Sequence, residues 1–134
     1  MKKTIMIAML AAGVTLAQAN NEITMKGLFN RGNKAVDPAD LKASDKCNLK
    51  VTLTPNGTET YKVVWVADWK GKPTTFTGEI KGDIKNGAFT GTATDRNGKR
   101  TWKVEGKSVN DVLTFDHFET TSGRNGKTGT GAMQ

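Results

Sequence analysis

The chain has 134 residues, of which 20 are basic and 13 acidic, and its formal net charge is +7. This length suits a single domain with one hydrophobic core. The Lys and Arg residues are scattered along the chain, as on a solvated surface, so we expect no nucleic-acid binding. The only cysteine, Cys47, excludes an intrachain disulfide and a cysteine zinc site. We expect it to be buried at the start of a strand rather than paired between chains.

The first 19 residues have the features of a cleaved secretory signal peptide. Lys2 and Lys3 precede an apolar stretch over residues 4–12, and Ala17-Gln18-Ala19 is a small-x-small cleavage site. The stretch is too short for a transmembrane span, and a buried N-terminal helix is the alternative. We therefore expect a periplasmic or secreted protein. Its mature part, residues 20–134, is expected to be a single β domain and retains 18 basic and 13 acidic residues, a net charge of +5.

The mature chain begins with one expected strand and a long polar connection. Over Glu22–Phe29, apolar and polar residues alternate, with Ile23, Met25 and Gly27 on one side. Residues 30–46 are mostly polar. Within them, Asp37-Pro38 is typical of a helix N-cap followed by proline at the first helical position, which predicts a short helix over residues 37–43.

From Cys47 onward, the pattern is that of successive strands. One predicted strand places its apolar residues on a single side: Leu49, Val51 and Leu53. Pro55-Asn56-Gly57 then indicates a turn. The next predicted strand, Tyr61–Trp69, is apolar on both sides, because Val64 and Val66 oppose a second apolar set: Tyr61, Val63, Trp65 and Ala67. We expect both sides of this strand to be covered.

Four aromatic residues recur at intervals of 13 residues: Phe76, Phe89, Trp102 and Phe115. This interval suits a strand of about eight residues plus a tight turn. Asn86-Gly87 and Asn97-Gly98 between them are strong signals for type I′ hairpin turns, and Asn110-Asp111 is a weaker one.

The two Asn-Gly turns also predict the pairing of the strands. A two-residue turn at the first pairs Ile84 with Phe89, Gly82 with Gly91, and Ile80 with Ala93. A turn at the second pairs Ala93 with Trp102, Gly91 with Val104, and Phe89 with Gly106. Because cross-strand partners share a face, both turns gather the same apolar residues on one side. The opposite side is polar: Thr75, Thr77, Glu79, Lys81, Thr90, Thr92, Thr94, Thr101, Lys103 and Glu105.

A sheet with one apolar side must bury that side. We therefore predict an all-β antiparallel meander of about eight strands, folded as a small up-and-down (calycin-like) β-barrel or as a two-layer β-sandwich. The short connections favour the barrel. Residues 120–134 are rich in Gly and Thr and form either a tail or a closing strand. A barrel of this size holds side chains or one small ligand, and whether a cavity remains is open.

Two segments resemble strands of avidin-type barrels. They are Trp69-Lys70 followed by Thr74-Thr75-Phe76-Thr77-Gly78, and Phe89-Thr90-Gly91-Thr92. The segments stand in the reverse order from that family, and the ligand-binding residues of its first strand and loop have no counterpart here. The resemblance is therefore limited to barrel strands and implies no ligand.

The sequence contains no recognisable catalytic, metal or cofactor motif. His117, the only histidine, is expected on the apolar side near Val104. It is either a general base at a barrel mouth or a strand-end residue bonded to water or backbone, and we favour the second. Glu79 and Glu105 fall on the outer side, which argues against a carboxylate pair for glycoside hydrolysis. We expect no metal and no cofactor.

Four residues are candidates for ligand binding: Trp65, Trp69, Trp102 and His117. Core packing is the default for tryptophans that alternate into a sheet, whereas Trp69 lies at a strand end where it is suited to stack on a sugar or a partner. The expected function is a non-catalytic binding or interaction module for a small apolar ligand, a glycan or a protein partner. The alternatives are a small enzyme that uses His117, and a structural or inhibitory envelope protein.

Overall fold

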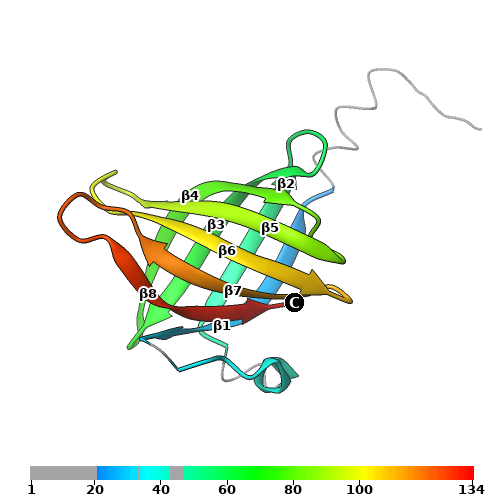
Figure 1. Cartoon of the computed structure of the whole chain (residues 1–134), viewed down its shortest axis with the longest axis horizontal. Coiled ribbons are helices and arrows are strands. Elements are labelled where there is room, and N and C mark those ends of the chain that lie inside the picture. Colours follow the sequence, from blue (N-terminus) through cyan, green and yellow to red (C-terminus); the bar gives the residue numbers. More distant parts are fainter. Residues whose placement is uncertain (1–20, 33, 43–46) are drawn as a thin grey trace, which may run out of the picture.

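The structure is a computed structural model that describes residues 21–32, 34–42 and 47–134, with only the backbone of Trp69. The predicted signal peptide lies outside these residues. Eight antiparallel strands form a closed up-and-down barrel, in which each strand pairs with the next and β8 pairs with β1 (Figure 1). This confirms the barrel and excludes the sandwich. The strands are β1 (Ile23–Arg31), β2 (Leu49–Pro55), β3 (Thr60–Trp69), β4 (Lys72–Gly82), β5 (Gly87–Asp95), β6 (Thr101–Val109), β7 (Val112–Glu119) and β8 (Gly126–Met133).

The Gly- and Thr-rich C-terminal segment is the closing strand, β8. It pairs with β7 on one side and with β1 on the other. Its glycines leave space for neighbouring groups, because a Cβ atom at Gly131 would collide with the ring of Phe115. A Cβ at Gly129 would likewise collide with the carbonyl of Asn30 and lie 2.7 Å from Nε2 of His117. The composition of β8 therefore lets it close the barrel beside two large side chains.

The connection between β1 and β2 carries the predicted short helix as a 3-10 helix, η1 (Pro38–Lys42). Oδ1 of Asp37 accepts a hydrogen bond from the backbone N–H of Ala39 at 3.0 Å, in agreement with its expected capping position. η1 contacts β1 and β8, and its Leu41 is buried. Thr130 of β8 donates a hydrogen bond to the carbonyl of Lys34 at 2.9 Å. The connection thus packs across the outer side of the seam where the barrel closes.

One of the two predicted registers is confirmed and the other is wrong by two residues. The β5–β6 pairing matches the prediction, as in the pair Ala93 and Trp102. In the β4–β5 pairing, Gly82 faces Phe89 and Ile80 faces Gly91. The cause is Asp83, whose Oδ1 accepts the backbone N–H groups of Lys85 and Asn86 at 2.9 and 3.0 Å and so organises a loop over residues 83–86. A shift of two residues preserves the face, so the apolar residues still point inward.

The two-residue turns occur elsewhere. Asn110 and Asp111, the weaker signal, have φ angles of 53° and 67° and form the type I′ turn between β6 and β7. Lys70 and Gly71, with φ of 54° and 80°, join β3 to β4 in the same way. Neither expected Asn-Gly pair forms a two-residue turn, because Gly87 already begins β5 and Asn97-Gly98 lies within the five-residue loop 96–100.

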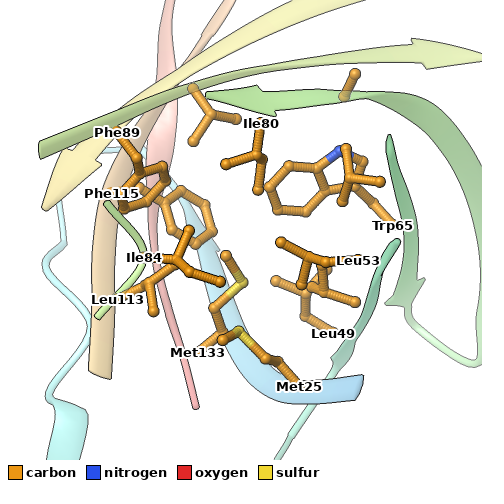
Figure 2. Close-up of a cluster of buried hydrophobic side chains, with 14 residues drawn as sticks. Met25, Leu49, Leu53, Trp65, Ile80, Ile84, Phe89, Leu113, Phe115 and Met133 are labelled. Carbon is orange, nitrogen blue, oxygen red and sulfur yellow. The ribbon is translucent and has the colours of Figure 1, made fainter. Parts of the chain in front are cut away.

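The barrel interior is filled at one end, near the β2–β3, β4–β5 and β6–β7 loops, which we call the closed end. Figure 2 shows the cluster of buried side chains, which includes Leu53, Ile80, Ile84, Leu113 and Met133. Ile84 belongs to the β4–β5 loop, yet it is buried with this cluster. The opposite end, near the β3–β4, β5–β6 and β7–β8 loops, is called the open end.

Two expectations about burial differ from the structure. Val64 on the outer side of β3 is 39% exposed, so this strand is not covered on both sides there. Its cross-strand neighbours are Thr52 and Thr77, so Val64 belongs to the Thr-rich outer surface. Cys47 is half-buried just before β2, with its sulfur 3.9 Å from the carbonyl oxygen of Leu41.

In the described part of the chain, no helix is long and apolar enough to cross a membrane.

The substitution Ile84→Ala tests the packing of the closed end. We expect the free energy of unfolding to fall by about 3 kcal/mol, because removal of a buried isoleucine side chain leaves a cavity. Urea denaturation measures this change. Val109→Ala is the control, since Val109 is 59% exposed at the same end of the barrel. It should change the free energy by less than about 0.5 kcal/mol. Equal losses in the two variants would contradict the account.

Candidate functional site: an apolar cavity at the open end

The interior of the barrel is not filled at the open end. A cavity of about 290 Å³ lies there between the strands. Nine of its lining residues are apolar and none is a carboxylate. The lining is Phe29, Arg31, Leu49, Trp65, Ala67, Thr74, Phe76, Ala93, Arg100, Trp102, Val104, Phe115, His117 and Thr128. Small residues such as Ala67 and Ala93 occupy inward positions here, where the closed end has Leu and Ile.

Trp65 lies among the cluster of buried side chains (Figure 2) and also lines the cavity. Its indole N–H donates a hydrogen bond to the backbone carbonyl of Thr92 on β5 at 3.1 Å, across the intervening strand β4. Gly78 of β4 makes this possible, because a Cβ atom there would collide with the backbone of Thr92. Trp65 also contacts Phe115 edge-to-face, with ring centroids 5.9 Å apart.

A second aromatic pair lines the cavity between β4 and β6. Phe76 and Trp102 pack edge-to-face, with ring centroids 5.2 Å apart and an interplanar angle of 83°. The guanidinium of Arg100 lies over the Trp102 ring, 4.9 Å from its centroid. Both contacts restrict the rotation of the Trp102 side chain at the open end.

Arg100 is itself held by a bidentate ion pair. Its Nε and Nη2 donate to the two carboxylate oxygens of Glu119 at 2.9 and 2.8 Å. Glu119 is buried, and the Arg100 guanidinium lowers the pKa of that carboxyl to about 2. A charge-assisted pair of this geometry is among the stronger hydrogen-bonding arrangements in proteins. Glu119, at the end of β7, therefore fixes the position of the Arg100 guanidinium over Trp102.

His117 lies at the seam where β8 closes against β1. Its Nδ1 is 2.6 Å from Oγ1 of Thr128, and its Nε2 is 3.2 Å from the carbonyl oxygen of Asn30. Burial lowers the pKa of the imidazole, which favours the neutral form at pH 7. The Thr128 hydroxyl also donates a hydrogen bond to the backbone carbonyl of His117 at 3.1 Å. The ring therefore joins β7 to both strands at the seam.

This arrangement does not support His117 as a general base. A catalytic histidine needs a partner that orients it and a proton to abstract within hydrogen-bond reach. Among the described residues, Nδ1 contacts a hydroxyl and Nε2 contacts a backbone carbonyl. Within this part of the chain, neither ring nitrogen hydrogen-bonds to a carboxylate. Asp116, its sequence neighbour, is instead paired with Lys127 at 3.3 Å.

The structure brings three of the four predicted site residues together. Trp65, Trp102 and His117 all line the cavity, whereas the side chain of Trp69 lies outside the described residues. The sequence analysis did not single out Phe29, although its place on the same side as Ile23 was visible. Arg100 was also missed, because its partner is 19 residues away and only the strand register brings the two together.

The part of the chain that the structure describes contains no group of three or more His, Cys, Asp or Glu residues that could hold a metal ion. A scan against protein-family models, a search of curated proteins and a search of solved structures each found no match to this chain. The interpretation of the cavity therefore depends on its own geometry.

Protonation of His117 should make stability depend on pH. The folded-state pKa lies below the ordinary 6.5, so the unfolded chain binds more protons between these two values. We expect the wild-type protein to lose stability as the pH falls below about 6.5, and His117→Gln to lose less over the same range. Urea denaturation at about pH 7.5 and about pH 5 measures this. An equal loss in both proteins would contradict the assignment.

The Arg100–Glu119 pair should contribute more to stability than the exposed Lys103–Glu105 pair of β6. We expect Glu119→Gln to lower the free energy of unfolding at pH 7 by about 2 kcal/mol, since two charge-assisted hydrogen bonds are weakened. This contribution is present above pH 4.5 and is lost as the pH falls toward about 2. The control is Glu105→Gln, which breaks an exposed pair with Lys103 and should cost less than about 0.5 kcal/mol. Denaturation curves that rank the variants in the opposite order would refute this.

Proposed function

We propose that this protein is a non-catalytic binding module that holds one small apolar molecule in the cavity at the open end. The observation that carries the proposal is a space of about 290 Å³, lined mainly by aromatic and aliphatic side chains, in a barrel whose other end is filled. Ligand pockets typically measure about 300 Å³ or more, so this one suits a small ligand. A single aromatic ring system or a short hydrocarbon chain matches it in size and polarity.

The aromatic side chains are already fixed, so a ligand can bind with little further loss of side-chain conformational entropy. Trp65 is held by Thr92 and Phe115, and Trp102 by Phe76 and Arg100. Immobilising a free side chain on binding costs about 0.5–1.5 kcal/mol. Because these side chains are already ordered in the folded protein, binding does not incur this cost. The rings therefore present a preformed apolar surface.

The proposal favours an apolar ligand over a glycan. Sugar recognition requires many hydrogen-bonding groups around the ring, whereas the polar groups of this lining are already occupied in part. The Trp65 N–H is bonded to Thr92, and the His117 ring to Thr128 and Asn30. On the features of the N-terminal segment alone, we propose that binding takes place outside the cytoplasm.

Ala93→Leu tests the cavity directly, with the uncharged fluorescent probe N-phenyl-1-naphthylamine as ligand. Ala93 lines the cavity, so the larger side chain fills it, and we expect probe affinity to fall by at least about tenfold. Fluorescence titration measures the affinity. The matched control is Ala88→Leu, on the exposed side of the same strand, which should bind like the wild type.

Two results would overturn the proposal. One is a wild-type protein that binds no apolar probe at all. The other is Ala93→Leu with wild-type affinity, since binding would then occur elsewhere. Thermal denaturation of each variant checks that both leucine substitutions leave the barrel folded.

A further inference from the structure

We infer that the ligand is a small apolar molecule with one negatively charged group, such as an aromatic carboxylate or sulfonate, held with its charge at the mouth of the barrel. This inference rests on the proposed function and adds the charge and the orientation of the ligand. It is carried by the charged residues of the lining and by the loops around the open end.

The charges of the cavity lining are of one sign. The lining contains Arg31 and Arg100, while no Asp or Glu belongs to it. His117 is predominantly neutral at pH 7, because burial lowers its pKa. An anionic group at this position meets attraction from two guanidinium groups and repulsion from no lining carboxylate.

The Arg100–Glu119 pair is arranged so that its positive member faces the solvent. The Arg100 side chain is 39% exposed, whereas that of Glu119 is 5% exposed. Glu119 engages Nε and Nη2 of the guanidinium, so Nη1 keeps its two donors for another acceptor. The carboxylate thus fixes the guanidinium from within the fold and leaves one donor edge for a ligand.

The hairpin loops at the two ends of the barrel carry net charges of opposite sign. The three hairpin loops of the open end contain only basic charges: Lys70, Arg96, Lys99, Arg100 and Arg124. The three of the closed end contain one basic and three acidic residues: Lys85, Glu59, Asp83 and Asp111. Such a separation produces a field that draws anions toward the open end.

The acids at the ends of the open-end strands do not cancel this field at the mouth. The Asp95 carboxylate accepts the backbone N–H groups of Lys99 and Arg100 at 2.9 and 3.2 Å, so it is turned toward its own loop. Asp68 shares the outer side of β3 with Val64. Asp116 is paired with Lys127. The β1–β2 connection also reaches the open end, and among its described residues Asp37 and Asp40 are balanced by Lys34 and Lys42. The basic hairpin loops therefore leave positive charge in excess where a ligand enters.

The test uses two probes with the same aromatic skeleton and different charge. N-phenyl-1-naphthylamine is neutral, and 8-anilinonaphthalene-1-sulfonate carries one negative charge. We expect the sulfonate to bind the wild type about threefold to tenfold more tightly at low salt, the size expected of one or two partly exposed ion pairs. This advantage should shrink as the ionic strength rises, because the charges lie near the solvent.

Variants at the mouth should affect the charged probe more than the neutral one. Arg31→Gln should weaken sulfonate binding by about threefold more than it weakens binding of the neutral probe. The double variant Arg100→Gln/Glu119→Gln keeps the net charge, and it should likewise weaken sulfonate binding more than neutral-probe binding. Lys85→Gln at the closed end is the control for net charge and should alter neither affinity. If the double variant does not fold, Arg31→Gln and the salt titration still decide the question.

The outcomes separate the two proposals. If neither probe binds, the proposed function fails and this inference fails with it. If the neutral probe binds and Ala93→Leu abolishes that binding, but the sulfonate binds equally or more weakly, the cavity stands and the charge preference is refuted. Tighter sulfonate binding that is as sensitive to Lys85→Gln as to Arg31→Gln would also refute it, since net charge alone would then explain the effect.

Discussion

The wall of an eight-stranded barrel encloses a space that its own inward side chains can just fill, so the size of those side chains decides where space remains. At the closed end the inward residues are large aliphatic ones, such as Leu53 and Leu113, and both are fully buried. Ile84 adds a further side chain from a loop. At the open end, Ala67 and Ala93 take inward positions, and a cavity remains between them and the aromatic rings. The site therefore results from an uneven filling of one interior.

The aromatic rings leave this space because glycines let them lie against the wall. Gly78 gives the Trp65 indole room to cross β4 and reach the carbonyl of Thr92. Gly131 does the same for the ring of Phe115 at β8. Glycine within a strand usually weakens it, and close approach of another group is one reason for its presence. In this barrel each such glycine leaves space beside its strand, and an aromatic side chain from another strand occupies that space.

Much of the fold could be predicted from local patterns. Alternation identified the inner and outer sides of the strands, and the second Asn-Gly turn predicted the β5–β6 register. The first turn failed because the side chain of Asp83 binds two backbone N–H groups and lengthens the loop, which residue type alone does not reveal. The sequence did not decide whether the segment that forms β8 is a tail or a strand, because its glycines carry no side chain that would show an alternation.

The site was less predictable than the fold. Trp65, Trp102 and His117 were identified because inward aromatic and ionisable residues stand out in an alternating strand. The volume of the cavity depends on how each ring is turned, which the sequence does not show. A crystal structure under xenon pressure tests the central claim most directly, because xenon enters dry apolar cavities. The account predicts xenon between Trp65, Trp102 and Phe115 and none in the closed end. Collapsed rings with no xenon between them, or xenon bound in the closed end, would contradict it.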